Sequence, residues 1–239
     1  MNEAITILSA RMIRPLIKKK LFEKNILVDE FEFIKTVLLS DIDSLLTIKN
    51  DPPHYIFTSK KAVESFNFLL NENKVALPAN YHIYCLDGAT KKAVFKARMR
   101  PTLTAPSARQ LAQAIYQKGV SKKLIFFCSD IRRNDLPAFL SSSGIDVKEI
   151  VLYKTLLIPR AVTNYYNAIL FFSPSAVQSF FMSNKLNPGT TFFCIGPTTA
   201  DAVKEIAPGE TIIIADKTSQ QSVAEKVISH YNIKTNHIN

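Results

Sequence analysis

The sequence lacks several residues and patterns on which common protein classes depend. It has no tryptophan, only three cysteines and only six glycines in 239 residues. The cysteines lie far apart, which argues against a disulfide framework or a zinc site and favours a reducing, cytoplasmic compartment. The glycines form neither G-x-G-x-x-G nor G-x-x-x-x-G-K, so both common phosphate-loop motifs are absent.

No hydrophobic run reaches the length of a membrane span. The longest apolar runs, 168–172 and 211–215, are as long as strands and fall far short of the roughly 18 residues that a spanning helix needs. The N-terminus carries Glu3 and continues directly into a strand-like run, so no signal peptide is expected. We therefore expect no membrane partner.

Basic residues outnumber acidic ones by 30 to 20, giving a formal net charge of +10. A basic surface favours anionic partners, which include nucleic acid, anionic lipid and acidic small molecules. Most lysines occur in short pairs spread along the chain, whereas nucleic-acid-binding proteins more often gather basic residues on one face or tail. We expect most lysines to lie on solvated helix faces and expect no nucleic-acid partner.

An internal repeat organises the chain. FTSKKAVESF at 57–66 and FFSPSAVQSF at 171–180 are identical at six of ten positions and lie 114 residues apart. CLDGATKKAV at 85–94 matches CIGPTTADAV at 194–203, here 109 residues apart, and further matches keep the same order. Offsets that differ by a few residues are those that loop insertions produce, so the chain is predicted to hold two copies of one unit, about 4–118 and 123–231.

Each copy alternates short apolar runs with helical patterns, which predicts parallel sheets covered by helices on both faces. The expected helix starts include Ser173 followed by Pro174 and Gly196 followed by Pro197. The fold class is therefore predicted as α/β, with two similar domains. The expected strands are 5–9, 26–33, 55–58, 82–86 and 102–104 in the first copy, and 124–128, 146–152, 169–172, 192–195 and 211–215 in the second.

Small hydroxyl residues recur where an expected strand passes into a helix. In such a fold, helix N-termini point to the functional edge of the sheet and bind anions through free amides and the helix dipole. A single Ser or Thr at such a turn more often only caps a helix. Four turns of one kind, two in each copy, favour one ligand with several carboxylates; their hydroxyl residues are Ser59, Thr90, Ser173, Ser175, Thr198 and Thr199.

The sequence shows none of the common motifs for metal binding or nucleophilic catalysis. The four histidines lack metal-ligand spacing, no G-x-S-x-G motif occurs, and Asp130 beside Arg132 and Arg133 indicates a local ion pair or cap. One difference between the copies is chemical: Ile34 in the first corresponds to Tyr153 in the second. A phenol can donate a proton at neutral pH. Tyr153 is thus either a half-buried strand residue or a proton donor.

The chain resembles the uroporphyrinogen-III synthase family over nearly its whole length, through motifs in 57–66, 132–136, 144–155, 171–180 and 194–200. The resemblance implies two three-layer α/β domains, each with a parallel five-stranded sheet, joined by a two-stranded linker and exchanged between the repeats. It places 1–34 with 156–239 in one domain and 35–155 in the other. It also implies a cytoplasmic monomer.

The resemblance implies a lyase of haem biosynthesis that closes hydroxymethylbilane, a linear tetrapyrrole with many carboxylates, to uroporphyrinogen III. Ring D is inverted, water is lost and no cofactor is used. Tyr153 matches the tyrosine of the family's linker region, a candidate for protonating the leaving hydroxyl. The residues that match substrate-binding positions or turns are Arg11, Ser59, Thr90, Ser129, Ser173, Ser175, Thr198 and Thr199.

Two other readings stay open. Asp87 stands where the second copy has Gly196, and the glycine that the family often has before Arg132 is missing. These departures favour a non-catalytic binder of an acidic tetrapyrrole-like molecule. The net charge alone supports nucleic-acid binding, which would show as steeply salt-dependent affinity for random duplex DNA.

Overall fold

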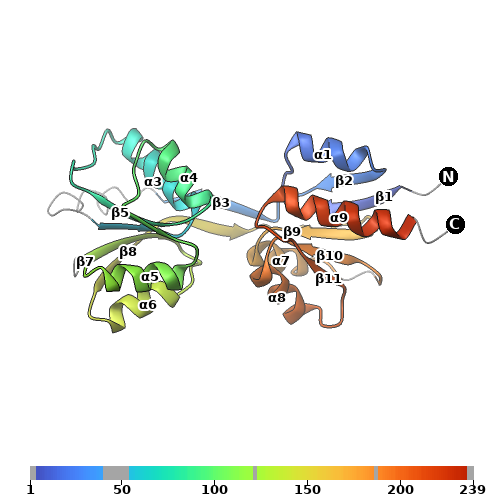
Figure 1. Cartoon of the computed structure of the whole chain (residues 1–239). Coiled ribbons are helices and arrows are strands. Elements are labelled where there is room, and N and C mark those ends of the chain that lie inside the picture. Colours follow the sequence, from blue (N-terminus) through green and yellow to red (C-terminus); the bar gives the residue numbers. More distant parts are fainter. Residues whose placement is uncertain (1–3, 40–53, 121–122, 186–187, 236–239) are drawn as a thin grey trace. The chain divides into compact units, whose positions relative to one another are not determined.

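The computed structural model describes residues 4–39, 54–120, 123–185 and 188–235 (Figure 1). The chain divides into two compact units. Unit 1 comprises Met1–Lys35 and Leu156–Asn239, and unit 2 comprises Thr36–Thr155. The chain passes from one unit to the other twice, once within strand β3 (Ile34–Leu38) and once within strand β8 (Asp146–Leu157).

Unit 1 is built on a five-stranded sheet with the order β11-β10-β9-β1-β2, whose strands pair in parallel. Alternate residues of each strand face opposite layers, so Ile169 and Phe171 of β9 pack with helices α7 and α8, and Leu170 packs with α1 and α9. The strands are β1 (Ile5–Ser9), β2 (Ile26–Glu30), β9 (Ala168–Phe171), β10 (Thr191–Cys194) and β11 (Ile212–Ile214). The helices are α1 (Pro15–Phe22), α7 (Pro174–Phe181), α8 (Pro197–Ile206) and α9 (Gln220–Thr235).

Unit 2 has a sheet with the order β3-β8-β7-β4-β5-β6. Helices α3 and α4 cover one face, and α5 and α6 cover the other. Its remaining strands are β4 (His54–Phe57), β5 (His82–Leu86), β6 (Leu103–Ala105) and β7 (Lys123–Ser129). Its helices are α3 (Lys60–Glu72), α4 (Ala89–Lys96), α5 (Ala108–Gln117) and α6 (Asp135–Ser142).

The α/β class and the mostly parallel sheets are confirmed. Both units share one strand order: β2-β1-β9-β10-β11 in unit 1 corresponds to β8-β7-β4-β5-β6 in unit 2. The sheet of unit 2 differs from the expected five strands because β3 adds a sixth at its edge. Amides of Leu39 and Ile158 donate to the carbonyls of Leu152 and Phe33 at 2.9 and 2.8 Å, so β3 runs antiparallel to β8.

The expected strand 26–33 ends earlier than predicted. Strand β2 stops at Glu30 because its partner β1 ends at Ser9, and the last bond between these segments runs from the Phe31 amide to the Ser9 carbonyl. The chain then starts a second strand, β3, that pairs with β8 instead.

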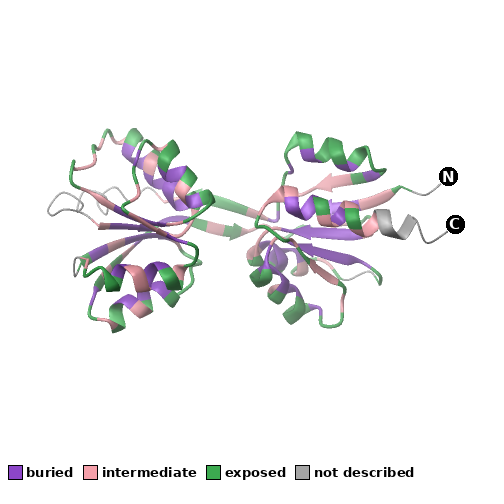
Figure 2. Ribbon diagram, in the orientation of Figure 1, coloured by how far each residue is buried: buried purple, intermediate pink, exposed green. Residues whose placement is uncertain are grey.

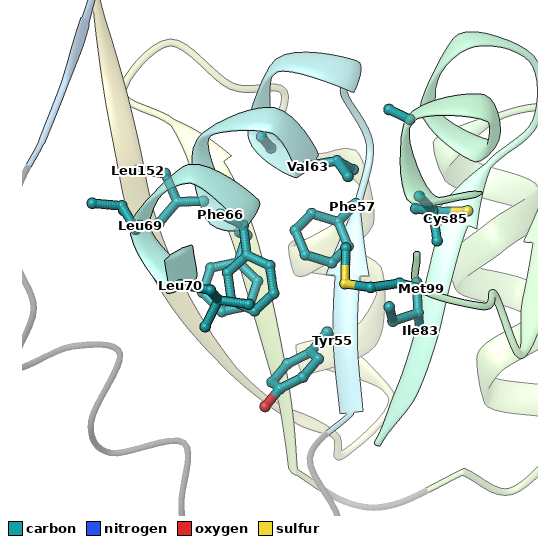
Figure 3. Close-up of a cluster of buried hydrophobic side chains, with 14 of the residues drawn as sticks. Tyr55, Phe57, Val63, Phe66, Leu69, Leu70, Ile83, Cys85, Met99 and Leu152 are labelled. Carbon is teal, nitrogen blue, oxygen red and sulfur yellow. The ribbon is translucent and has the colours of Figure 1, made fainter. Parts of the chain in front are cut away.

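Aromatic side chains fill the core between the sheet of unit 2 and its helices α3 and α4 (Figure 3). The ring of Phe66 on α3 lies 5.6, 5.3 and 4.5 Å from those of Tyr55, Phe57 and Phe127. Burial is concentrated in the strands and the inner helix faces, as Figure 2 shows for both units. These cores hold the strand ends in place, and the loops at those ends carry the predicted site residues.

Candidate functional site

A cavity of about 390 Å³ lies in unit 2 at the carboxyl ends of β4, β5 and β7. Helices α3, α5 and α6 begin beside it, so three helix N-termini face this edge of the sheet. Two of the predicted site residues, Ser59 and Ser129, line it together with the predicted proton donor Tyr153. The structure therefore brings these three residues to one place, as expected for the crevice of a parallel α/β sheet.

Tyr153 reaches the cavity because of an irregularity in β8. Cys128 pairs with Val151 and the next residue, Ser129, pairs with Tyr153, which leaves Leu152 as an extra residue in β8. Side chains on a regular strand alternate between faces, and one extra residue reverses that alternation. Leu152 and Tyr153 are consequently both buried, at 2% and 8% exposure, and the Asp130 amide donates to the Tyr153 carbonyl at 3.2 Å.

The Tyr153 hydroxyl forms a hydrogen bond with the Ser59 hydroxyl, with 3.1 Å between the oxygens. Ser59 is the N-cap of α3, and its oxygen also accepts from the Ala62 amide at 3.0 Å. Ser107 caps α5 in the same way, accepting from the Gln110 amide at 3.3 Å, and it lines the same cavity. The caps hold both serine side chains against the helix N-termini.

The cavity wall carries a cationic side chain. Arg132 forms an ion pair with Glu149, whereas Arg133 is exposed and has no ion pair among the described residues. Asp130 forms neither the predicted ion pair nor a helix cap among the described residues, because the N-cap of α6 is Asn134. Its carboxylate instead accepts from the amides of Ile131 and Thr155 at 3.0 and 3.1 Å. Arg133 and the helix N-termini together make the cavity favourable for anions.

Cys128 also lines the cavity, but its chemistry is that of a packed thiol. Burial, followed by the charge of Glu149, raises the pKa of Cys128 to about 11. The thiol therefore stays protonated at neutral pH, and a thiolate nucleophile is not formed there.

The predicted residues of unit 1 follow three neighbouring strands at their carboxyl ends. Arg11 follows β1, with its guanidinium 5.6 Å from the centre of the Phe172 ring. Ser173 caps α7 by accepting from the Ala176 amide at 3.2 Å. On α8, Thr198 is exposed and Thr199 is 1% exposed. Ser175, on the first turn of α7, is half-buried.

Thr90 of unit 2 is not among the residues that line the cavity. It lies on the first turn of α4, after Gly88, whose φ of +73° is in the left-handed region that favours glycine, and it is 5% exposed. The neighbouring Asp87, which departs from the pattern of the second copy, forms an ion pair with Lys91 at 3.6 Å.

Across the described ranges, no three His, Cys, Asp or Glu side chains gather in a way that would hold a metal ion. In the same part of the chain, no helix is both long enough and apolar enough to cross a membrane.

A family model for uroporphyrinogen-III synthase HemD matches residues 28–225. The chain belongs to this family. Uroporphyrinogen-III synthases are enzymes of tetrapyrrole biosynthesis, so the expectation that the sequence resemblance raised is confirmed. The comparison with curated proteins gives no match.

Solved structures of uroporphyrinogen-III synthases share the fold. A mutant uroporphyrinogen III synthase from the extremely thermophilic bacterium Thermus thermophilus matches with a TM-score of 0.72 at 15% identity, covering 97% of this chain and 100% of that one. The uroporphyrinogen-III synthetase from Helicobacter pylori matches with a TM-score of 0.65 at 20% identity, covering 95% and 99%. At identities of 15% and 20%, the likeness shows that the fold is shared. The roles of individual residues have to be argued from the geometry of the site.

Four polar residues that line the cavity are not among the predicted site residues: Thr58, Ser107, Arg132 and Arg133. From the sequence, the side chains of the two arginines are interpreted only as partners for Asp130. Ser107 and Arg133 line the same cavity as Ser59 because β4, β7 and the start of α5 come together when unit 2 folds. The usable signal was the capping pattern: Ser107 precedes an amphipathic helix after a short strand, as Ser59 does.

Proposed function

We propose that the chain acts as a lyase that closes hydroxymethylbilane to uroporphyrinogen III, with ring D inverted and water lost. Membership of the uroporphyrinogen-III synthase family supports this reaction. The structural observation that carries it is the pair of hydroxyls of Tyr153 and Ser59, 3.1 Å apart, in a cavity favourable for anions. A substrate with many carboxylates suits the helix N-termini and Arg133.

In the proposed mechanism Tyr153 protonates the leaving hydroxyl of ring A, and the C–O bond breaks to release water. The Ser59 oxygen accepts from the Ala62 amide, so the Ser59 proton is available for the Tyr153 oxygen. That arrangement leaves the phenolic proton for the substrate and stabilises the phenolate as the proton departs. No cofactor is required, because the new C–C bond forms within the tetrapyrrole and the proton that ring D loses on closure restores the Tyr153 phenol.

The other proposed substrate-binding residues act on carboxylates rather than on the reacting centre. Ser129 lines the cavity of unit 2, where it lies directly opposite Tyr153. The remaining members of this set lie at the carboxyl ends of strands in their own unit: Arg11, Thr90, Ser173, Ser175, Thr198 and Thr199. Holding a flexible chain in one conformation supplies most of the selectivity, because the substrate also closes unaided to the other isomer.

We also propose that units 1 and 2 are the two domains of the enzyme, that they arose by duplication, and that the enzyme is a cytoplasmic monomer. The shared strand order and the sequence repeat support the duplication. The three cysteines are buried and free, which suits a reducing compartment. Light scattering coupled to gel filtration tests the monomer.

The decisive experiment supplies hydroxymethylbilane in situ from the deaminase that makes it and separates the oxidised products by isomer. We expect the protein to convert the product from the type I to the type III isomer. If only the type I isomer forms while the protein binds the substrate in equilibrium dialysis, the non-catalytic binder is the correct reading. If the protein neither binds nor converts it, both readings are wrong.

A further inference from the structure

A second hollow of unit 2 lies outside the cavity of the proposed function. It is a groove of about 590 Å³ between helices α3 and α4, which lie side by side (Figure 1). It has no lining residue in common with the cavity that holds Tyr153. Its apolar wall includes Val63, Phe68, Ala93 and Ala97, and the Phe68 side chain is 51% exposed.

Lysines edge this groove. Lys60 forms an ion pair with Glu64 at 3.2 Å, so its charge is compensated locally. Lys92 and Lys96 lie one turn apart on α4, both are exposed, and neither forms an ion pair within the described ranges. An apolar wall beside two uncompensated cations is complementary to a molecule that has an apolar body and an acidic group.

Unit 1 provides an internal comparison, because α7 and α8 are the repeat counterparts of α3 and α4. At the positions of Asn67 and Ala97 the repeat places Phe181 and Ile206, which are much larger. At the positions of Lys92 and Lys96 it places Asp201 and Glu205. The Phe181 ring packs against other rings of unit 1, 5.1 Å from Phe180.

The helix pair of unit 1 therefore carries bulk and negative charge where that of unit 2 carries small side chains and positive charge. The groove and its charge are features of this helix pair and do not follow from the architecture that both units share. A volume of about 590 Å³ lies within the range of roughly 300–1,000 Å³ of small-molecule sites.

We propose that the groove between α3 and α4 binds an amphipathic organic anion, such as a medium-chain carboxylate. The apolar body packs on Phe68, Ala93 and Ala97, and the acidic group lies between Lys92 and Lys96. Binding at this groove is independent of the proposed tetrapyrrole chemistry, because the two hollows are lined by different residues.

The test is isothermal titration of the full chain with decanoate below its micelle concentration, and with decanol as the uncharged probe. We expect saturable binding of about one decanoate per chain and much weaker binding of decanol. The double variant Lys92→Asp/Lys96→Glu introduces the residue types that unit 1 has at the equivalent positions. Decanoate should bind to this variant about tenfold more weakly than to the parent chain, because two attractive interactions become repulsive. Lys19→Asp/Lys20→Glu on α1 makes the same change in net charge at two residues that do not line the groove and should leave binding unchanged.

A second variant tests the apolar wall without changing charge. The double variant Asn67→Phe/Ala97→Ile introduces the larger residue types that unit 1 has at the equivalent positions, and these side chains fill the groove. The variant should lose decanoate binding, and its circular dichroism spectrum should match that of the parent chain. Binding that is absent in the parent chain, or equal in the parent chain and both groove variants, would overturn the proposal. Failure of either kind leaves the isomer assay of the proposed function unaffected, so the two can be judged separately.

Discussion

The two units place different side chains opposite the last residue of two corresponding strands, β1 and β7. In unit 1 the last residue of β1, Ser9, pairs with Glu30, and in unit 2 the last residue of β7, Ser129, pairs with Tyr153. Glu30 is satisfied within its own unit: Lys18 lies 2.6 Å from its carboxylate and the Ile13 amide donates to it at 2.6 Å. Tyr153 has a serine partner and opens on a cavity.

The comparison shows how one architecture serves stability in one unit and chemistry in the other. A carboxylate that already has a cation and an amide as partners holds the first loop of unit 1 in place. Among the described residues, the Tyr153 hydroxyl has only the Ser59 hydroxyl as a hydrogen-bond partner, so it keeps a proton that it can give to a substrate. Substitutions at equivalent or contrasting positions can break or sharpen this distinction.

The largest effect is expected in the two aromatic cores, at the repeat-equivalent residues Phe66 and Phe180. Each ring packs against three other aromatic rings of its own unit, so Phe66→Ala and Phe180→Ala should each cost about 3–5 kcal/mol. Hydrogen exchange measured by mass spectrometry should show the loss of protection mainly in unit 2 for the first variant and in unit 1 for the second. Equal loss in both units for either variant would show that they unfold as one.

The next effect concerns catalysis. Tyr153→Phe removes only a hydroxyl and should lower the rate of type III formation by about a hundredfold, the lower end of the usual contribution of a general acid. The matched control is Tyr116→Phe, which removes an exposed hydroxyl in the same unit and should keep the parent rate. The isomer assay measures both, and a parent-like rate for Tyr153→Phe would make Tyr153 a structural residue like Glu30.

Glu30→Gln tests the stabilising role of the carboxylate in unit 1. Burial alone would raise the pKa of Glu30, but the Lys18 hydrogen bond, the Ile13 amide and the Lys18 charge together lower it below 4.5. The carboxylate thus stabilises the fold above pH 4.5, and this contribution is lost as the pH falls through the lower pKa of the folded state.

Urea unfolding at pH 7 should show a loss of about 1–3 kcal/mol for Glu30→Gln, and the difference from the parent should shrink toward pH 3. Glu23→Gln is the control, because its pair with Lys19 is exposed and 4.0 Å long and should contribute less than about 0.5 kcal/mol. A difference that grows on acidification would contradict the assigned direction of the pKa shift.

The smallest effect is expected at Ser65 and Ser179, which occupy the same position of the repeat on α3 and α7. Both are buried, and within the part of the chain that the structure describes neither hydroxyl has a hydrogen-bond partner. Ser65→Ala and Ser179→Ala should therefore leave stability unchanged or raise it by up to about 1 kcal/mol, since alanine also favours helices. A loss above about 1 kcal/mol in only one of them would reveal a partner specific to that unit, seen as a lower urea midpoint.

Much of the architecture could be predicted because short stretches of sequence determine where many of the strands and helices begin and end. The buried run of β9 and the Ser173–Pro174 start of α7 each depend on neighbours in sequence. The break between β2 and β3 could not be predicted, because β2 ends where its partner β1 ends and not where its own apolar run ends.

The candidate site was predictable in its residue types but not in its geometry. Tyr153 was identified by its difference from the first copy, yet strict alternation along β8 would place it on the face opposite Leu152. The extra residue in β8 appears only through pairing with β7. Arg133 and Ser107 come to the cavity through contacts between distant segments. The local capping pattern can mark Ser107 as a helix start, but it does not reveal which residues lie across the cavity from it.

The double crossing of the chain has a consequence during synthesis. All strands of the unit that contains Thr36–Thr155 have left the ribosome before any residue far beyond Leu157 is exposed, so this unit can fold while translation continues. Strand β1, by contrast, lies between β2 and β9 in the sheet. It cannot pair with β9 until more than a hundred further residues have been translated. Strand β1 thus has only one of its two neighbours until β9 is translated, and the apolar edge that will pair with β9 stays open during that interval.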